Sequence, residues 1–126
     1  MNNTKQANIN IKIKDLFFRW LEITSAFHNL TIQQKKVLGL LLYHHFRLKS
    51  EITNKKILWK LVFDYETKRL IKEELNIKDS VLQNILTKFR KIGVIKNNQI
   101  TSTFIPDINK DSNNFKVIFN FNIIHE

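Results

Sequence analysis

Histidine is the residue type in this sequence best suited to bind a metal ion or to transfer protons near neutral pH. His44 and His45 are adjacent, and neighbours on a helix point in different directions, so they do not form the i, i+4 pair that a metal site needs. His28 and His125 each stand alone in the sequence. The histidines therefore predict no metal site.

Carboxylates, glycines and cysteines give no sign of an active site either. Asp64 and Glu66 are the one close carboxylate pair near a possible turn, and no nucleophile or tuned base stands beside them, so we interpret them as a helix start. Two glycines are too few for a phosphate-binding loop, and without cysteine there is no disulfide, thiolate zinc ligand or thiol nucleophile. We predict a protein that is not an enzyme, with no catalytic residue, no cofactor and no small-molecule substrate.

The charge of the chain is strongly positive. Its 21 Lys and Arg against 11 Asp and Glu give a net charge of +10, which attracts polyanions and makes nucleic acid the default partner. An AT-rich genome, which encodes much Asn, Ile and Lys, is the alternative source of this bias. Residues 31–63 contain seven basic residues and one acidic residue, whereas residues 64–96 contain eight and five. The most positive segment therefore lies ahead of residue 64.

Length and hydropathy predict one ordinary domain. The 126 residues are 43% hydrophobic, which is enough for a single core. We expect residues 1–8 to be disordered and residues 9–126 to form one domain with an N-terminal extension over residues 9–30. The N-terminus lacks the apolar core of a signal peptide, and no apolar run approaches the ~20 residues of a membrane span. We expect a soluble protein without a membrane partner.

The extension is predicted to contain a strand and a helix. Ile9, Ile11 and Ile13 alternate with polar residues, which favours a half-buried strand. From Asp15 onward, the apolar residues up to Phe27 recur at helical spacing.

Capping residues predict three helices after the extension. Thr31 and Gln34 form a capping box ahead of a helix over 32–48, and Gly39 inside that helix is interpreted as tolerated rather than as a close backbone contact. Asn54 precedes a short, largely apolar helix, and Asp64 precedes a helix over 65–75.

A turn, a second motif helix and a hairpin are predicted next. Asn76 can adopt the left-handed conformation of a sharp turn, and Ile77 can fill the angle between the helices. The following helix, over 79–92, begins near a possible Ser80–Gln83 capping box and ends at Gly93. Strands are expected near 94–105, around an Asn-Asn hairpin turn, and near 115–124, with the N-terminal isoleucine strand as a candidate third member.

The run from Lys68 to Ile95 resembles the winged helix-turn-helix superfamily. In that family, as here, a first helix ends at glycine or asparagine, a hydrophobic plug follows, and a recognition helix closes on glycine before an aliphatic pair. The residues at the family's packing positions are Leu75, Ile77, Leu82, Leu86, Phe89, Gly93 and Ile95. The resemblance implies an α+β fold with a three-helix core and a β-wing, to which this chain adds an N-terminal strand and helix.

This resemblance also implies a DNA interface. The helix 79–92 would enter the major groove, where Gln83 and Asn84 can each make two hydrogen bonds to adenine. The basic residues would contact phosphates, whereas Asp79 would disfavour tight binding. A solvated helix face carries the same residue types, which is the alternative interpretation. The residues predicted to contact DNA are Lys78, Ser80, Gln83, Asn84, Thr87, Lys88, Arg90, Lys91, Lys96 and Asn98.

The stretch from Leu40 to Ile95, with a Leu-Leu-Leu-Tyr helix and a Leu-Trp-Lys-Leu segment, also resembles small proteins of phages of gut Bacteroidetes, including the crAss-like group. This implies a phage-encoded protein in the cytoplasm of the bacterial host or in the virion. Two alternatives to a DNA-binding protein remain open. One is a virion protein of the connector, neck or tail ring that self-associates or binds other phage structural proteins. The other is an adaptor that regulates another protein without touching DNA.

Overall fold

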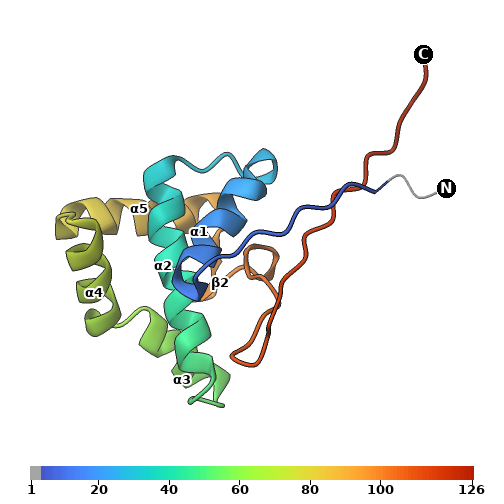
Figure 1. Cartoon of the computed structure of the whole chain (residues 1–126). Coiled ribbons are helices and arrows are strands. Elements are labelled where there is room, and N and C mark those ends of the chain that lie inside the picture. The colour runs from blue at the N-terminus through green and yellow to red at the C-terminus, as the bar shows by residue number, and fades with distance from the viewer. Residues whose placement is uncertain (1–3) are drawn as a thin grey trace.

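The computed structural model of the chain describes residues 4–126 and has an α+β architecture (Figure 1). Five α-helices come first, followed by a short antiparallel hairpin; the order is α1 (Ile13–Ile23), α2 (Ile32–Lys49), α3 (Lys55–Val62), α4 (Tyr65–Leu75), α5 (Asp79–Ile92), β1 (Ile95–Lys96) and β2 (Gln99–Ile100). Two 3₁₀ turns, η1 (Ser25–Phe27) and η2 (Ser102–Phe104), lie in the connections.

The central helix is α2, against which α1, α3, α4 and α5 all pack. Its buried face includes Val37, Leu38 and Leu41, each no more than 1% exposed. Gly39 lies where α1 crosses, and a Cβ added there would be 3.2 Å from the backbone nitrogen of Phe18. The interpretation of Gly39 as merely tolerated was therefore wrong, because the glycine allows two helix backbones to approach closely.

The predicted helix starts are confirmed by their caps. Thr31 Oγ1 accepts from the Gln34 backbone nitrogen at 3.1 Å, and Gln34 Oε1 accepts from the Thr31 backbone nitrogen at 2.9 Å, which is a complete capping box. Asn54 and Asp64 accept from the backbone nitrogens of Ile57 and Thr67. The N–H groups in the first turn of a helix have no acceptor within the helix, and these side chains accept from them, so the helices begin at these positions.

The turn between α4 and α5 is the predicted one. Asn76 is left-handed, with φ 52° and ψ 51°, and Ile77 packs against the core. The Ser80–Gln83 capping box was wrong, because the N-cap is Lys78 and Ser80 already lies inside α5. The left-handed conformation that ends a helix causes steric strain in most residues. Glycine avoids the strain because it has no side chain, and asparagine tolerates it because its side chain can hydrogen-bond locally.

The hairpin is shorter than predicted. Asn97 and Asn98 both have positive φ, and the register pairs Ile95 with Ile100 and Lys96 with Gln99. The expected strand over 94–105 ends at Ile100, because η2 then turns the chain away from β1. This turn is fixed by Trp20, whose Nε1 donates to the carbonyl oxygen of Phe104 at 2.9 Å.

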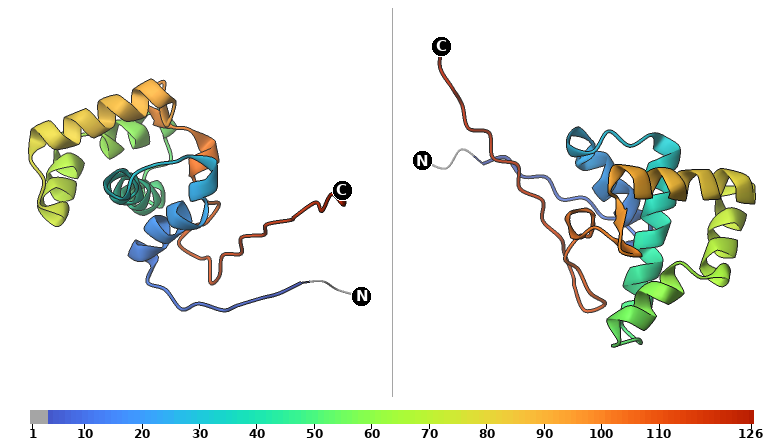
Figure 2. Two further views of the ribbon diagram at one scale, coloured as in Figure 1. Left: turned by 90° about the horizontal axis from the view of Figure 1, so that it is seen from above. Right: turned by 180° about the vertical axis from the view of Figure 1, so that it is seen from behind.

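The two other predicted strands are absent from the described residues. The N-terminal arm (residues 4–12) has no regular structure, and Ile13, expected at the end of a strand, begins α1 instead. The C-terminal arm (residues 113–126) is extended but unpaired. An alternating pattern makes one face apolar, but a strand also needs a neighbouring backbone to bond. Both arms leave the body on the same side (Figure 2).

Helix α1 belongs to the common core, although the sequence suggested an added element. Phe17 and Leu21 are 2% and 0% exposed, and both lie among buried residues of α2. The predicted disorder over 1–8 falls partly outside the described residues, since residues 1–3 are not described; residues 4–8 have neither helix nor strand.

Candidate nucleic-acid interface

Helix α5 is held by one strongly apolar side. Leu82, Leu86 and Phe89 are 0% exposed and Ile85 is 8% exposed. Successive helical residues are separated by about 100°, so these four share one side, and the residues between them face outward. The core thus fixes which side of α5 meets solvent.

Most of the residues predicted to contact DNA share that outward side. Ser80, Asn84, Thr87, Lys88, Arg90 and Lys91 are exposed, and Gln83 is half-buried. By the helical spacing, Ser80, Asn84, Thr87 and Lys91 lie nearly in line, with Gln83 and Arg90 on one flank and Lys88 on the other. The structure therefore brings two amides and three cations together on one accessible surface.

The remaining predicted residues lie at the two ends of α5. Lys78 is its exposed N-cap, and Lys96 and Asn98 are exposed on the hairpin that follows its carboxyl end. Gly93, with φ 87°, makes this junction, and Thr101 Oγ1 donates to its carbonyl oxygen at 2.6 Å. A short glycine turn thus keeps the hairpin next to the last turn of α5.

The acidic residues near this surface already have partners. Asp79 accepts from Lys72 Nζ at 3.1 Å, and Arg69 binds both Glu66 and Glu73. Glu74 pairs with Lys14, and Asp64 caps α4. The Arg69 guanidinium also holds the pKa of Glu66 below its usual range through a hydrogen bond. These are exposed pairs, so each contributes little stability, but they offset the negative charge locally.

The cations of the surface itself have no such partner. Among residues 4–126, no carboxylate lies within salt-bridge distance of Lys78, Lys88, Arg90, Lys91 or Lys96. Counting charges along residues 64–96 therefore understated the positive charge of this surface, because the count added acids that are paired on α4 or across the turn. The spacing of Glu66, Arg69 and Glu73 on one helix does indicate two of these pairs from the sequence, whereas the Lys14–Glu74 and Lys72–Asp79 pairs have no such local signal.

The basic residues of 31–63, in contrast, do not form one patch. Lys35 and Lys36 lie at the start of α2, whereas Lys55, Lys56 and Lys60 are exposed on α3, beyond the other end of that helix (Figure 1). The two basic residues of the last turn of α2, Arg47 and Lys49, contact His44 and the carbonyl oxygen of Ile108. The most positive segment of the sequence is thus spread over separate surfaces.

A groove of about 380 Å³ adjoins the carboxyl half of α5. Lys88 and Ile92 line one side of it, and Asn29 and Leu30, just before α2, line another together with Gln34 in the first turn of α2. Sequence reasoning did not connect these residues, since nothing in their spacing indicates that the start of α2 lies beside α5. Lys88 therefore stands between the outward side of α5 and this groove.

The histidines of α2 are core residues. His45 is 9% exposed and stacks on Trp59 with ring centroids 4.3 Å apart, and His44 is 8% exposed. Burial, with smaller effects of Lys49 and Lys55, lowers the pKa of His45 to about 4; burial and Arg47 also lower the pKa of His44. Within the described residues, no three His, Asp or Glu side chains are grouped as a metal site would need.

Two further findings bear on partners. Over residues 4–126, no helix combines the length and apolar character needed to cross a lipid bilayer. Comparison with models of protein families, with curated proteins and with solved structures found no match.

Proposed function

We propose that α2, α4, α5 and the hairpin form a winged helix-turn-helix, and that this non-enzymatic chain binds duplex DNA through the outward side of α5. The observation that supports the proposal is the unpaired charge on that side. Lys88, Arg90 and Lys91 lie beside Gln83 and Asn84, while the nearby carboxylates are paired elsewhere. Phosphate contacts would give affinity, and the two amides would read base edges.

The arrangement gives each part of the surface a separate task. With α5 in the major groove, Lys78 would approach phosphates at its amino end. Lys96 and Asn98 of the hairpin would contact the backbone or the minor groove beyond its carboxyl end. Lys88, beside the groove next to α2, would meet phosphates on one flank of the helix, and Arg90 would meet them on the other.

The test compares two sets of three cations. In Lys88→Ala/Arg90→Ala/Lys91→Ala, all three changed residues are exposed on α5; in Lys55→Ala/Lys56→Ala/Lys60→Ala, all three are exposed on α3. Both variants lose the same charge. Titrating labelled duplex DNA at several salt concentrations should show that the α5 variant loses affinity and that its salt slope falls by roughly one per lost contact. The α3 variant should change far less. Equal losses in both variants, or no binding by the unaltered chain at low salt, would refute the proposal.

A structural role in a tailed-phage particle is the second candidate. It is favoured by the exposed apolar residues of the arms, such as Ile118 and Phe121, which are 86% and 84% exposed. Such side chains are typical of surfaces that other proteins cover. Mass spectrometry of purified particles distinguishes the two candidates, since a virion component is present there in stoichiometric amounts and a DNA-binding regulator is not.

A further inference from the structure

The C-terminal arm has the residue pattern of a β-strand without the bonding. Phe115, Val117, Phe119, Phe121 and Ile123 occupy alternate positions, which place them on one face of an extended chain. Among the described residues, no backbone hydrogen bond involves residues 113–126. Phe121 and Ile123 are 84% and 76% exposed. An extended segment with free backbone groups and an apolar face readily pairs with another strand.

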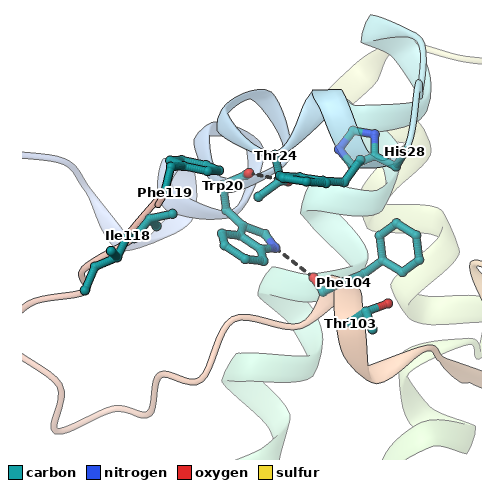
Figure 3. Close-up of a pocket in the computed structure, with 9 residues that line it drawn as sticks. Trp20, Thr24, His28, Thr103, Phe104, Ile118 and Phe119 are labelled. Carbon is teal, nitrogen blue, oxygen red and sulfur yellow. Dashed lines mark hydrogen bonds between the residues drawn. The ribbon is translucent and has the colours of Figure 1, made fainter. Parts of the chain in front are cut away.

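The first half of the arm is anchored on the body. Phe115 lies edge-on to Trp20 with ring centroids 5.7 Å apart, and Phe119 stacks on Phe27 at 6.2 Å. These contacts border a groove of about 390 Å³ between α1, η2 and the arm (Figure 3). In this groove the indole nitrogen of Trp20 donates a hydrogen bond to the carbonyl oxygen of Phe104. The body therefore directs the second half of the arm, from residue 120 onward, away into solvent (Figure 1).

Charge indicates what kind of partner the arm fits. Lys116 and Glu126 are its charged residues, so its formal net charge is zero within a chain of net charge +10. A polyanion finds no attraction there. A second copy of this chain, which is repelled by most of the basic surface, meets no such repulsion at the arm. The arm is thus the part of the molecule where two copies approach at least electrostatic cost.

The N-terminal arm supplies further strands to such a pairing. Ile9 and Ile11 repeat the alternation, and both arms project from the same side of the body (Figure 2). The chain runs toward the body in one arm and away from it in the other, which is the relation of antiparallel strands. One chain offers two strands, and a two-stranded ribbon is at best marginally stable; two chains offer four.

We propose that the C-terminal arm pairs with the C-terminal arm of a second copy as antiparallel β-strands, giving a two-fold symmetric dimer whose sheet is extended by the N-terminal arms. Because the same arm pairs with itself about a two-fold axis, two copies use up the interface, and the assembly stops at a dimer instead of growing into a filament. Phe121 and Ile123 pack against side chains of the neighbouring strand on the apolar face of this sheet, next to the anchored Phe119.

Sedimentation velocity on the full chain tests the proposal through two matched double variants. Phe121→Lys/Ile123→Lys adds two charges to the apolar face of the arm, and Asn120→Lys/Asn122→Lys adds the same two charges to the opposite face. All four residues are exposed, so the body should fold in both variants. The unaltered chain and the asparagine variant should be dimers, whereas the Phe121/Ile123 variant should have a dissociation constant about 100-fold higher or more.

Three outcomes overturn the proposal: a monomer at every concentration, a dimer that survives in the Phe121/Ile123 variant, or equal loss in both variants, which indicates charge and not strand pairing. Because the chain has no cysteine, single cysteines at positions 116 to 124 give a second test. In an antiparallel pair of identical strands, the same residue of the two copies is adjacent only where the strands cross the two-fold axis. Disulfide cross-linking between copies of a single-cysteine variant should therefore be strongest at one or two neighbouring positions and fall off on both sides. Cross-linking that is equally efficient along the whole arm contradicts the pairing even where a dimer exists.

Discussion

Lys72 Nζ lies 3.1 Å from Asp79 Oδ1, so a cation of α4 is bonded to the first residue of α5 across the Asn76 turn. The pair places a positive charge beside the one acidic residue that the proposed DNA interface contains. Lys72 therefore reduces the repulsion between Asp79 and DNA phosphates that the sequence led us to expect. The repulsion that remains can be measured by replacing Asp79.

Replacing Asp79 should strengthen DNA binding. Asp79→Asn removes a negative charge near phosphates and frees Lys72, so affinity at low salt should rise about two- to fivefold, equivalent to about 0.5 to 1 kcal/mol. Asp111→Asn, an equal charge change in an exposed loop, is the control and should have a smaller effect. Fluorescence anisotropy with labelled duplex measures both. A larger gain in the control would place the interface elsewhere.

Base reading should depend on the two amides of α5. Gln83→Ala or Asn84→Ala should cost about 1 to 3 kcal/mol on a preferred duplex, selected from a random library, and leave binding to unrelated duplexes nearly unchanged. This differs from the loss of Lys88 or Arg90, which should weaken binding to all sequences. Competition titrations against non-specific DNA separate the two effects. Equal weakening on both kinds of duplex would mean that the amides read no bases.

Leu86 should be among the most costly positions of the core to truncate. It is 0% exposed on the buried side of α5, so Leu86→Ala should lower the free energy of unfolding by about 2 to 5 kcal/mol. Its neighbour Thr87 is exposed, and Thr87→Ala should stay within about 0.5 kcal/mol. Urea denaturation gives both values, and an unchanged midpoint for Leu86→Ala would contradict the packing of α5.

The close crossing of α1 and α2 predicts that replacing Gly39 with a β-branched residue destabilises the fold. A Cβ at this position would lie 3.2 Å from the Phe18 backbone nitrogen, so Gly39→Val should cost about 1 to 3 kcal/mol through overpacking. Gln33→Val, at an exposed position of the same helix, controls for the helix propensity of valine. If both variants unfold at the same urea concentration, the two backbones are not in close contact.

Stability should fall on mild acidification because His45 is buried without charge. Its pKa is lowered to about 4 from an ordinary value of 6.5, so below pH 6.5 the unfolded chain takes up a proton that the folded chain refuses. The stabilisation is complete above that pH and is lost as the pH falls toward 4. In His45→Phe, which keeps a ring to stack on Trp59, the midpoint in urea should decline less over this range. An identical decline would assign the effect to other groups, such as His44.

The helices could be predicted from the sequence because their signals are local. Thr31, Asn54 and Asp64 cap backbone nitrogens three residues ahead, and Asn76 and Gly93 end helices by their own conformation. The outward side of α5 followed from the period of its apolar residues. All these features depend on neighbours within one or two turns of helix.

The strands and the charge of the site could not be predicted in the same way. Alternation in the two arms was correctly recognised as a pattern, but pairing needs a partner backbone, which the pattern does not specify. Lys14 pairs with Glu74, a residue far away in the sequence. The charge count over residues 64–96 therefore included an acidic residue whose charge is offset by a cation outside that segment. The close approach at Gly39 likewise depends on α1, a separate element.

Asn76, Gly93, Asn97 and Asn98 all have positive φ, and they make the tight connections at the two ends of α5: from α4 into α5, and from α5 into and through the hairpin. Because these connections are tight, the contacts of α4 with α5 and of α5 with the hairpin join segments that are close in sequence, and little chain entropy is lost in closing them. Proteins dominated by such local contacts fold in microseconds to milliseconds. This unit is therefore expected to form early and rapidly once synthesised, and to give α1 and the C-terminal arm a surface on which to settle.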